Sequence, residues 1–110
     1  MRWRGPALAA YLAAVTGTDA VIAPVAPMPA ATIAESDVGN SLDAEAVIQR
    51  ITKFTRPINY LGLPSLSIPA GFTKAGLPVG MQLIGRPFDE AGLSRIGAAF
   101  QRATDFHQQV

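Results

Sequence analysis

The chain has 110 residues, of which 49% are hydrophobic and 15% charged, a composition typical of one globular domain at most. Nine basic and eight acidic residues leave a net charge of +1, so the sequence offers no basic stripe for a nucleic-acid backbone. The absence of cysteine excludes disulfides, thiolate metal sites and a cysteine nucleophile. We therefore expect a cytoplasmic protein that has no nucleic-acid partner.

The N-terminal segment combines two arginines with the apolar run Ala7 to Val15, an order that also occurs in signal peptides. No small-x-small cleavage site follows, and the run is far shorter than the roughly 20 residues of a membrane span. Apolar residues at helical spacing, followed by Gly17, instead predict a helix over residues 7–16 and no membrane segment. The next apolar run predicts a buried strand from Ala20 to Ala23.

Residues 24–40 are rich in proline and have no hydrophobic period, so we expect a loop. A helix should follow, because Ala44, Val47, Ile48 and Ile51 lie at helical spacing, and Asn40 or Ser41 could cap it.

A shorter helical turn is predicted from Thr55, whose hydroxyl could cap it, to Gly62. Asn59 lies inside this turn and could lock it to an adjacent loop through its side-chain amide. We would then expect removal of the amide to destabilise the fold.

Two strands are predicted over residues 65–68 and 79–84, joined by a turn at Gly76 and paired as antiparallel or near neighbours. The last helix begins after Asp89, which caps it. Helices alternating with strands give an α/β class. Because neither face of the strand over residues 79–84 is plainly polar, the strands need cover on both sides, and residues 1–110 are expected to be an incomplete domain.

The sequence shows no nucleophile in a G-x-S-x-G turn, no phosphate-binding glycine motif and no metal-ligand spacing. Ser65 and Ser67 are interpreted as locally bonded strand hydroxyls, and His107 as a solvated residue near the C-terminus. We therefore expect no catalytic residue, no metal site and no cofactor in this chain.

The segments "FTRPINYLGLPSLSIPAGF", "GLPVGMQLIGRPFDE" and "ATDFH" together resemble the C-terminal part of the amidase signature enzymes, and "TDAVIAPVAPMPA" is similar to the strand and proline loop that precede it there. The resemblance implies part of a mixed sheet flanked by helices. It also implies hydrolysis of carboxylic amides through a serine acyl-enzyme, with a Ser, a second Ser in a cis peptide and a Lys from an upstream Gly/Ser-rich region that nothing here matches.

In the family, the helical turn after the second helix borders the acyl pocket. The resemblance therefore implies that five residues face the substrate or support its pocket: Thr55, Ile58, Asn59, Leu61 and Gly62. A small-molecule amide substrate is expected only together with the missing N-terminal part. The isolated chain is expected to be inactive, and to self-associate or pair with that part.

Three alternatives stay open. One is a non-catalytic module, or a decayed fragment, that keeps the scaffold to bind a protein partner. Another is an independent α/β domain with its own ligand. The third is a fragment of a glutamine-using amidotransferase subunit. Those subunits tend to carry an acidic residue three positions before the motif threonine, where this chain has Thr52, so a plain amidase is favoured.

Overall fold

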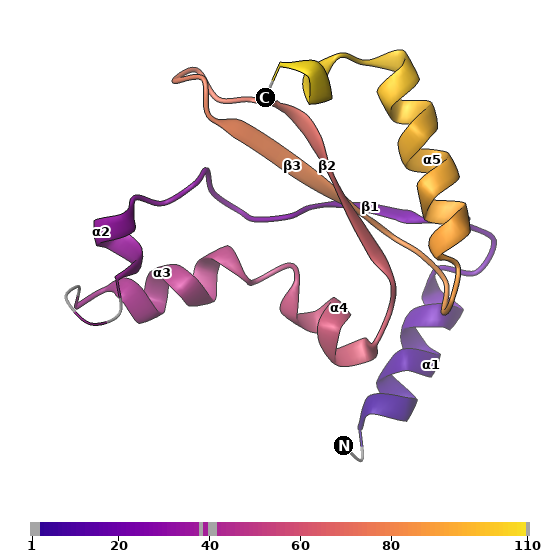
Figure 1. Cartoon of the computed structure of the whole chain (residues 1–110). Helices are drawn as coiled ribbons and strands as arrows, with labels where there is room; N and C mark the ends of the chain where they lie inside the picture. The colour runs from indigo at the N-terminus through magenta and orange to yellow at the C-terminus, as the bar shows by residue number, and fades with distance from the viewer. Residues whose placement is uncertain (1–2, 38, 40–41, 110) are drawn as a thin grey trace.

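The computed structural model describes residues 3–37, 39 and 42–109. The chain forms a three-stranded sheet with helices on both sides of it (Figure 1), which confirms the predicted α/β class. In chain order the elements are α1 (Arg4–Ala14), β1 (Val21–Pro24), α2 (Ile33–Ser36), α3 (Ala44–Ile51), α4 (Arg56–Leu61), β2 (Ser65–Phe72), β3 (Pro78–Ile84), α5 (Glu90–Ala103) and the 3-10 helix η1 (Phe106–Gln108).

Strand β3 lies at the centre of the sheet, whose order is β1-β3-β2. Both neighbours pair with it in the antiparallel sense, and Ile84 is opposite Val21 on one side and Ser65 on the other. The expected pairing of the last two strands is confirmed. On their own the three strands form an antiparallel sheet, and the mixed sheet implied by the resemblance would need further strands.

The turn between β2 and β3 is the one predicted at Gly76, whose φ of 85° is in the left-handed region that glycine adopts without strain. Strand β2 continues past its predicted end to Phe72. Pro69 still pairs with Gly80, and the ladder then shifts register in a bulge between Pro69 and Gly71.

One face of the sheet is covered by α1 and α4, which lie side by side (Figure 1). Ile58, Leu61 and Leu63 pack there against Ile84, together with apolar residues of α1. Burying such side chains stabilises a fold by about 1.5–3 kcal/mol each.

Helix α5 covers the other face, where Leu93 packs against Ile68 and Leu83. Leu83 is 1% exposed and lies at the centre of this second core. Helices of this chain therefore cover both faces of the sheet with apolar side chains, cover that the sequence predicts to come from the rest of a larger domain.

Two helices differ from the prediction. Helix α1 runs from Arg4 to Ala14, three residues earlier than the predicted start, since the chain is already helical at its N-cap Trp3. Helix α2 lies inside the region predicted as loop. It is held by a capping box in which the Thr32 hydroxyl accepts from the Glu35 amide and the Glu35 carboxylate accepts from the Thr32 amide.

Helix α3 runs from the first to the last residue of the predicted apolar stripe, although its suggested caps Asn40 and Ser41 lie outside the described residues. The capping role predicted for Thr55 is wrong. Thr55 already has helical backbone angles and its hydroxyl donates to the carbonyl of Thr52 at 3.3 Å, whereas a capping side chain needs an extended backbone. The predicted stop at Gly62 is confirmed by its left-handed φ of 73°.

Helices α2 and α3 pack on each other to one side of the sheet (Figure 1). The molecule is flat as a result, with extents of 43 × 41 × 18 Å. In the described ranges, no helix is both long enough and apolar enough to cross a bilayer.

Candidate functional site

The centre of the site is Gln82, in the middle of β3. It is 2% exposed and is the one buried polar side chain in the part of the chain that the structure describes. A buried amide costs free energy unless its hydrogen-bonding groups find partners. Gln82 has them, because its Nε2 donates to the carbonyls of Pro24 at 3.1 Å and Phe54 at 3.0 Å, and its Oε1 accepts from the Ser65 hydroxyl at 3.0 Å.

These three bonds join segments that are distant in sequence. Pro24 ends β1, Phe54 lies in the corner between α3 and α4 (residues 52–55), and Ser65 begins β2. One side chain of the central strand therefore links both edge strands to the corner that leads into α4.

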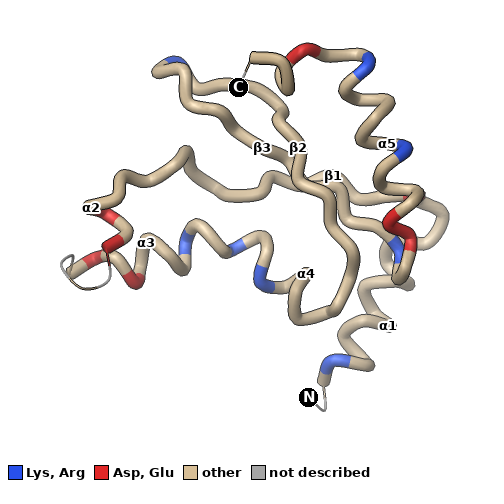
Figure 2. The backbone as a smooth tube through the Cα atoms, in the orientation of Figure 1, with Lys and Arg blue, Asp and Glu red and all other residues tan. Residues whose placement is uncertain are grey.

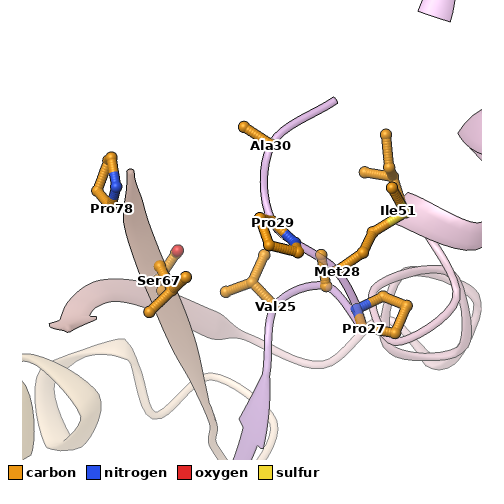
Figure 3. A pocket seen from close by; sticks show the side chains of 11 residues that line it. Val25, Pro27, Met28, Pro29, Ala30, Ile51, Ser67 and Pro78 are labelled. Carbon is orange, nitrogen blue, oxygen red and sulfur yellow. The ribbon is translucent and has the colours of Figure 1, made fainter. Parts of the chain in front are cut away.

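An open cavity of about 420 Å³ lies beside these bonds. We call it the proline-loop cavity, because the loop over residues 25–30 forms one wall. The other walls are Ile51 at the end of α3 and parts of β2 and β3, including Ser67 and Pro78. In Figure 3 the side chains of the loop lie between Ser67 and Pro78 on one side and Ile51 on the other.

The side chains that line the cavity are apolar except for that of Ser67. Ser67 supplies its one hydroxyl, and no lining residue carries a charge. Figure 2 shows that the charged residues lie on helices and loops, and none lies on the three strands. Such a lining suits an uncharged, largely apolar group with a single hydrogen-bonding function.

The five residues predicted to face or support a substrate pocket lie in or next to α4. Ile58 and Leu61 are buried in the core shared with α1, and Thr55 is half-buried. Asn59 and Gly62 are exposed. None of the five lines the proline-loop cavity. The corner that Gln82 binds through Phe54 contains Thr55 and directly precedes the helix that carries the other residues, and the role of all five toward substrate stays a prediction.

The locking role predicted for Asn59 is wrong. Its side chain is exposed and makes no hydrogen bond within the described ranges, because it points away from the core that Ile58 and Leu61 enter. A buried side-chain amide does hold this corner, but it belongs to Gln82 in β3. The predicted cost of removing the Asn59 amide therefore loses its basis.

The serines and the histidine do not form a catalytic pair. Among the described residues, no serine hydroxyl is hydrogen-bonded to an imidazole or amine. Ser65 donates to Gln82, which is 17 residues away on the neighbouring strand, so the local bonding predicted for this serine is wrong. His107 is half-buried, with its Nδ1 buried and unpartnered within the described chain, so the solvated position predicted for it is wrong. Its helix η1 packs on β2, where Phe106 contacts Phe72 and Phe100.

Two further observations bear on chemistry. The pKa of Tyr11, in α1, is raised by burial, and its hydroxyl has no partner among the described residues, a setting that keeps the phenol neutral. Within the same residues, no group of three or more His, Asp or Glu side chains is placed so that it could hold a metal ion.

Gln82 is not a residue that the sequence patterns singled out as functional. The available signal was its place as the one polar residue in the apolar run "VGMQLI" of β3. A polar side chain inside a strand that is covered on both faces needs internal partners, and that requirement marks it as a structural junction.

A family described as Amidase matches residues 5–93. Two curated relatives are A-type subunits of glutamyl-tRNA(Gln) amidotransferase. That of Myxococcus xanthus is 46% identical over 91 residues, which cover 83% of this chain and 18% of the relative. That of Levilactobacillus brevis is 47% identical over 100 residues, which cover 91% of this chain and 19% of the relative. The chain thus spans about a fifth of the length of these relatives.

Two solved structures have the same fold. The glutamyl-tRNA(Gln) amidotransferase A-type subunit from Thermotoga maritima matches 86% of this chain and 19% of its own, with a TM-score of 0.68 and 32% identity. A crystal structure of an amidase matches 91% of this chain and 23% of its own, with a TM-score of 0.74 and 26% identity. Since the family match covers most of the residues and the relatives exceed 40% identity, the chain belongs to the amidase signature family.

Proposed function

We propose that this chain is the C-terminal scaffold segment of an amidase-type hydrolase that cleaves carboxylic amide C–N bonds through a serine acyl-enzyme. The observation that supports this most is the match with a solved amidase across 91% of the chain at a TM-score of 0.74. Acyl transfer needs a nucleophile and a base within hydrogen-bond reach, and the described serines have no such base. We therefore assign the three catalytic residues, a Ser, a second Ser in a cis peptide and a Lys, to the remainder of the enzyme.

In this proposal the segment supplies one side of the substrate pocket. The apolar proline-loop cavity would receive the uncharged part of an amide, and Thr55, Ile58, Asn59, Leu61 and Gly62 would support or border the acyl pocket from α4. The two buried members of this set act through packing, since their side chains fill the core against α1.

The partner we propose is the remaining, N-terminal portion of an amidase domain. The chain matches less than a quarter of the solved amidase, and it exposes large apolar side chains such as Ile22 and Phe88 that a larger domain would cover. A cytoplasmic location, expected from the lack of cysteine, stays a prediction.

The test is release of ammonia from benzamide and propionamide. The chain alone should give no turnover, whereas the chain mixed with the solved amidase from which the matching segment has been removed should hydrolyse both. That remainder without this chain is the control. Turnover by the chain alone, lost on Ser65→Ala, Ser67→Ala or His107→Ala, would contradict the proposal.

A second candidate is a segment of a glutamine-using amidotransferase subunit, which the names of the curated relatives favour. Against it, Thr52 is uncharged and its hydroxyl donates to the carbonyl of Ile48 at 2.9 Å, so it offers no carboxylate to a substrate ammonium. Mixing this chain with the Myxococcus xanthus relative lacking its matching segment separates the two. Ammonia release from glutamine but not from benzamide would favour the amidotransferase.

A further inference from the structure

We propose that Gln82 is the positioning residue of the proline-loop cavity. Its side-chain amide binds the end of β1, where the proline loop begins, and the corner that follows Ile51. It thereby fixes the positions of these two cavity walls relative to the central strand. The relevance of this role to substrate rests on the proposed function. The positioning itself is a property of this chain and is tested without turnover.

The side-chain amide of Gln82 has one arrangement that satisfies its partners. Both Pro24 and Phe54 present carbonyl oxygens, which only accept, so the Nε2 group with its two protons must face them. Oε1 then faces Ser65, whose hydroxyl can donate. The reversed amide would set an oxygen against two carbonyl oxygens, so the three partners orient the side chain.

The two carbonyls belong to the segments that carry cavity walls. Pro24 is joined directly to Val25, the first lining residue of the proline loop, and Phe54 lies three residues after Ile51 on the opposite wall. Both carbonyls meet on the same nitrogen of Gln82, which sits on the rigid central strand. The amide thus sets the relative position of the two walls.

Few other hydrogen bonds tie the corner to the sheet. Among the described residues, the other hydrogen bonds of residues 52–55 stay within the corner and the adjoining helices, as in the bond from the Thr55 amide to the Thr52 carbonyl. The proline loop has a backbone bond to the sheet, from the Val25 amide to the Gly80 carbonyl at 3.4 Å. Losing the Gln82 amide should therefore loosen both walls and spare the helices.

A measurement on the unaltered chain tests the bonds directly. The side-chain NH₂ protons of Gln82, followed by NMR, should exchange with solvent about tenfold or more slowly than those of the exposed Gln49 and Gln108, since both are held in buried bonds. Exchange at the same rate in all three glutamines would overturn the proposal.

A variant tests the consequence. In Gln82→Met, which keeps the length of the side chain and removes its amide, backbone exchange at Val25 and Thr55 should accelerate about tenfold. Exchange at Gly62 and Leu93, whose amides bond within α4 and α5, should stay within about twofold. Equal acceleration at all four amides, or none, would overturn the proposal.

Ser65→Ala is the matched control, because it removes a bond to the same side chain and leaves both carbonyl bonds in place. It should leave exchange at Val25 and Thr55 close to that of the unaltered chain. A Ser65→Ala effect as large as that of Gln82→Met would mean that general packing around β2, rather than the two carbonyl bonds, holds the walls.

Discussion

Gly62 ends α4 with a left-handed φ of 73°, and a side chain there would meet the guanidinium of Arg4. Gly62→Ala should lower the free energy of unfolding by about 1–2 kcal/mol, because non-glycine residues are strained in this conformation. Denaturant unfolding would measure it.

Asn59→Ala is the control for Gly62→Ala, since Asn59 is an exposed residue of the same helix and should change stability by no more than about 0.5 kcal/mol. Coincident unfolding midpoints for the two variants would show that the turn at Gly62 is not strained by a side chain.

At the level of single residues, the sequence predicted what depends on local backbone geometry. Gly62 and Asp89 are examples, because a left-handed stop and a helix cap are properties of a few neighbouring residues. Gln82 was not predicted as a junction, since its partners lie 17, 28 and 58 residues away. The prediction for Asn59 also failed because it depended on contacts distant in sequence. The packing of α4 on α1 decides which face of the helix is buried, and Asn59 lies outside that face.

Helix α5 packs on β2, and Gly97 is a buried residue of the helix that lies next to Leu66 of the strand. A Cβ added there would lie 2.6 Å from Leu66 Cδ2. Gly97→Val should therefore destabilise the fold by about 1–3 kcal/mol through overpacking, although it replaces a poor helix former.

The control for Gly97→Val is Ala98→Val, the next residue of α5, which is exposed and should cost only about 0.5 kcal/mol in helix propensity. Thermal melting of the two variants compares them. A Gly97→Val chain as stable as the unaltered one would mean that α5 does not pack as described.

The short helix α2 depends on the capping box. Hydrogen bonds from the backbone and side chain of Thr32 lower the pKa of Glu35 below its ordinary value. The stabilisation is therefore present above the ordinary glutamate pKa and is lost as the pH falls through the lowered folded value. The Thr32 amide resonance should shift with a midpoint below that of a model glutamate.

Glu35→Gln serves as the control for this titration, because a neutral amide oxygen can still accept from the Thr32 backbone. In that variant the Thr32 resonance should show no such transition. A midpoint in the unaltered chain at or above that of a model glutamate would contradict the capping box.

Element types were predictable where periodicity was strong. Apolar residues at helical spacing over residues 44–51 predicted α3, and the cap at Asp89 predicted the start of α5. Apolar runs on either side of the turn at Gly76 predicted β2 and β3. Helix α2 was missed because four residues show no period, although "TIAE" carries the Thr and Glu of a capping box. The continuation of β2 past Pro69 depends on a bulge that only the pairing with β3 reveals.

The whole molecule exposes more surface to solvent than a compact monomer of the same mass would. A compact monomer of 11.5 kDa should expose about 5,800 Å², whereas this chain exposes 7533 Å². Its radius of gyration is 16.0 Å, against about 13 Å for a compact chain of this length. The excess includes apolar side chains such as Ile22 on the edge strand β1 and Phe88, which are 67% and 94% exposed. Such exposure favours association with a covering partner.

Sedimentation velocity tests the central claim most directly, that this chain is one part of an amidase domain. The chain alone should self-associate, and adding the solved amidase from which the matching segment has been removed should convert it into a complex of one copy of each. The same remainder mixed with an unrelated chain of equal size is the control. A single monomeric species of this chain, unchanged when the amidase remainder is added, would contradict the account.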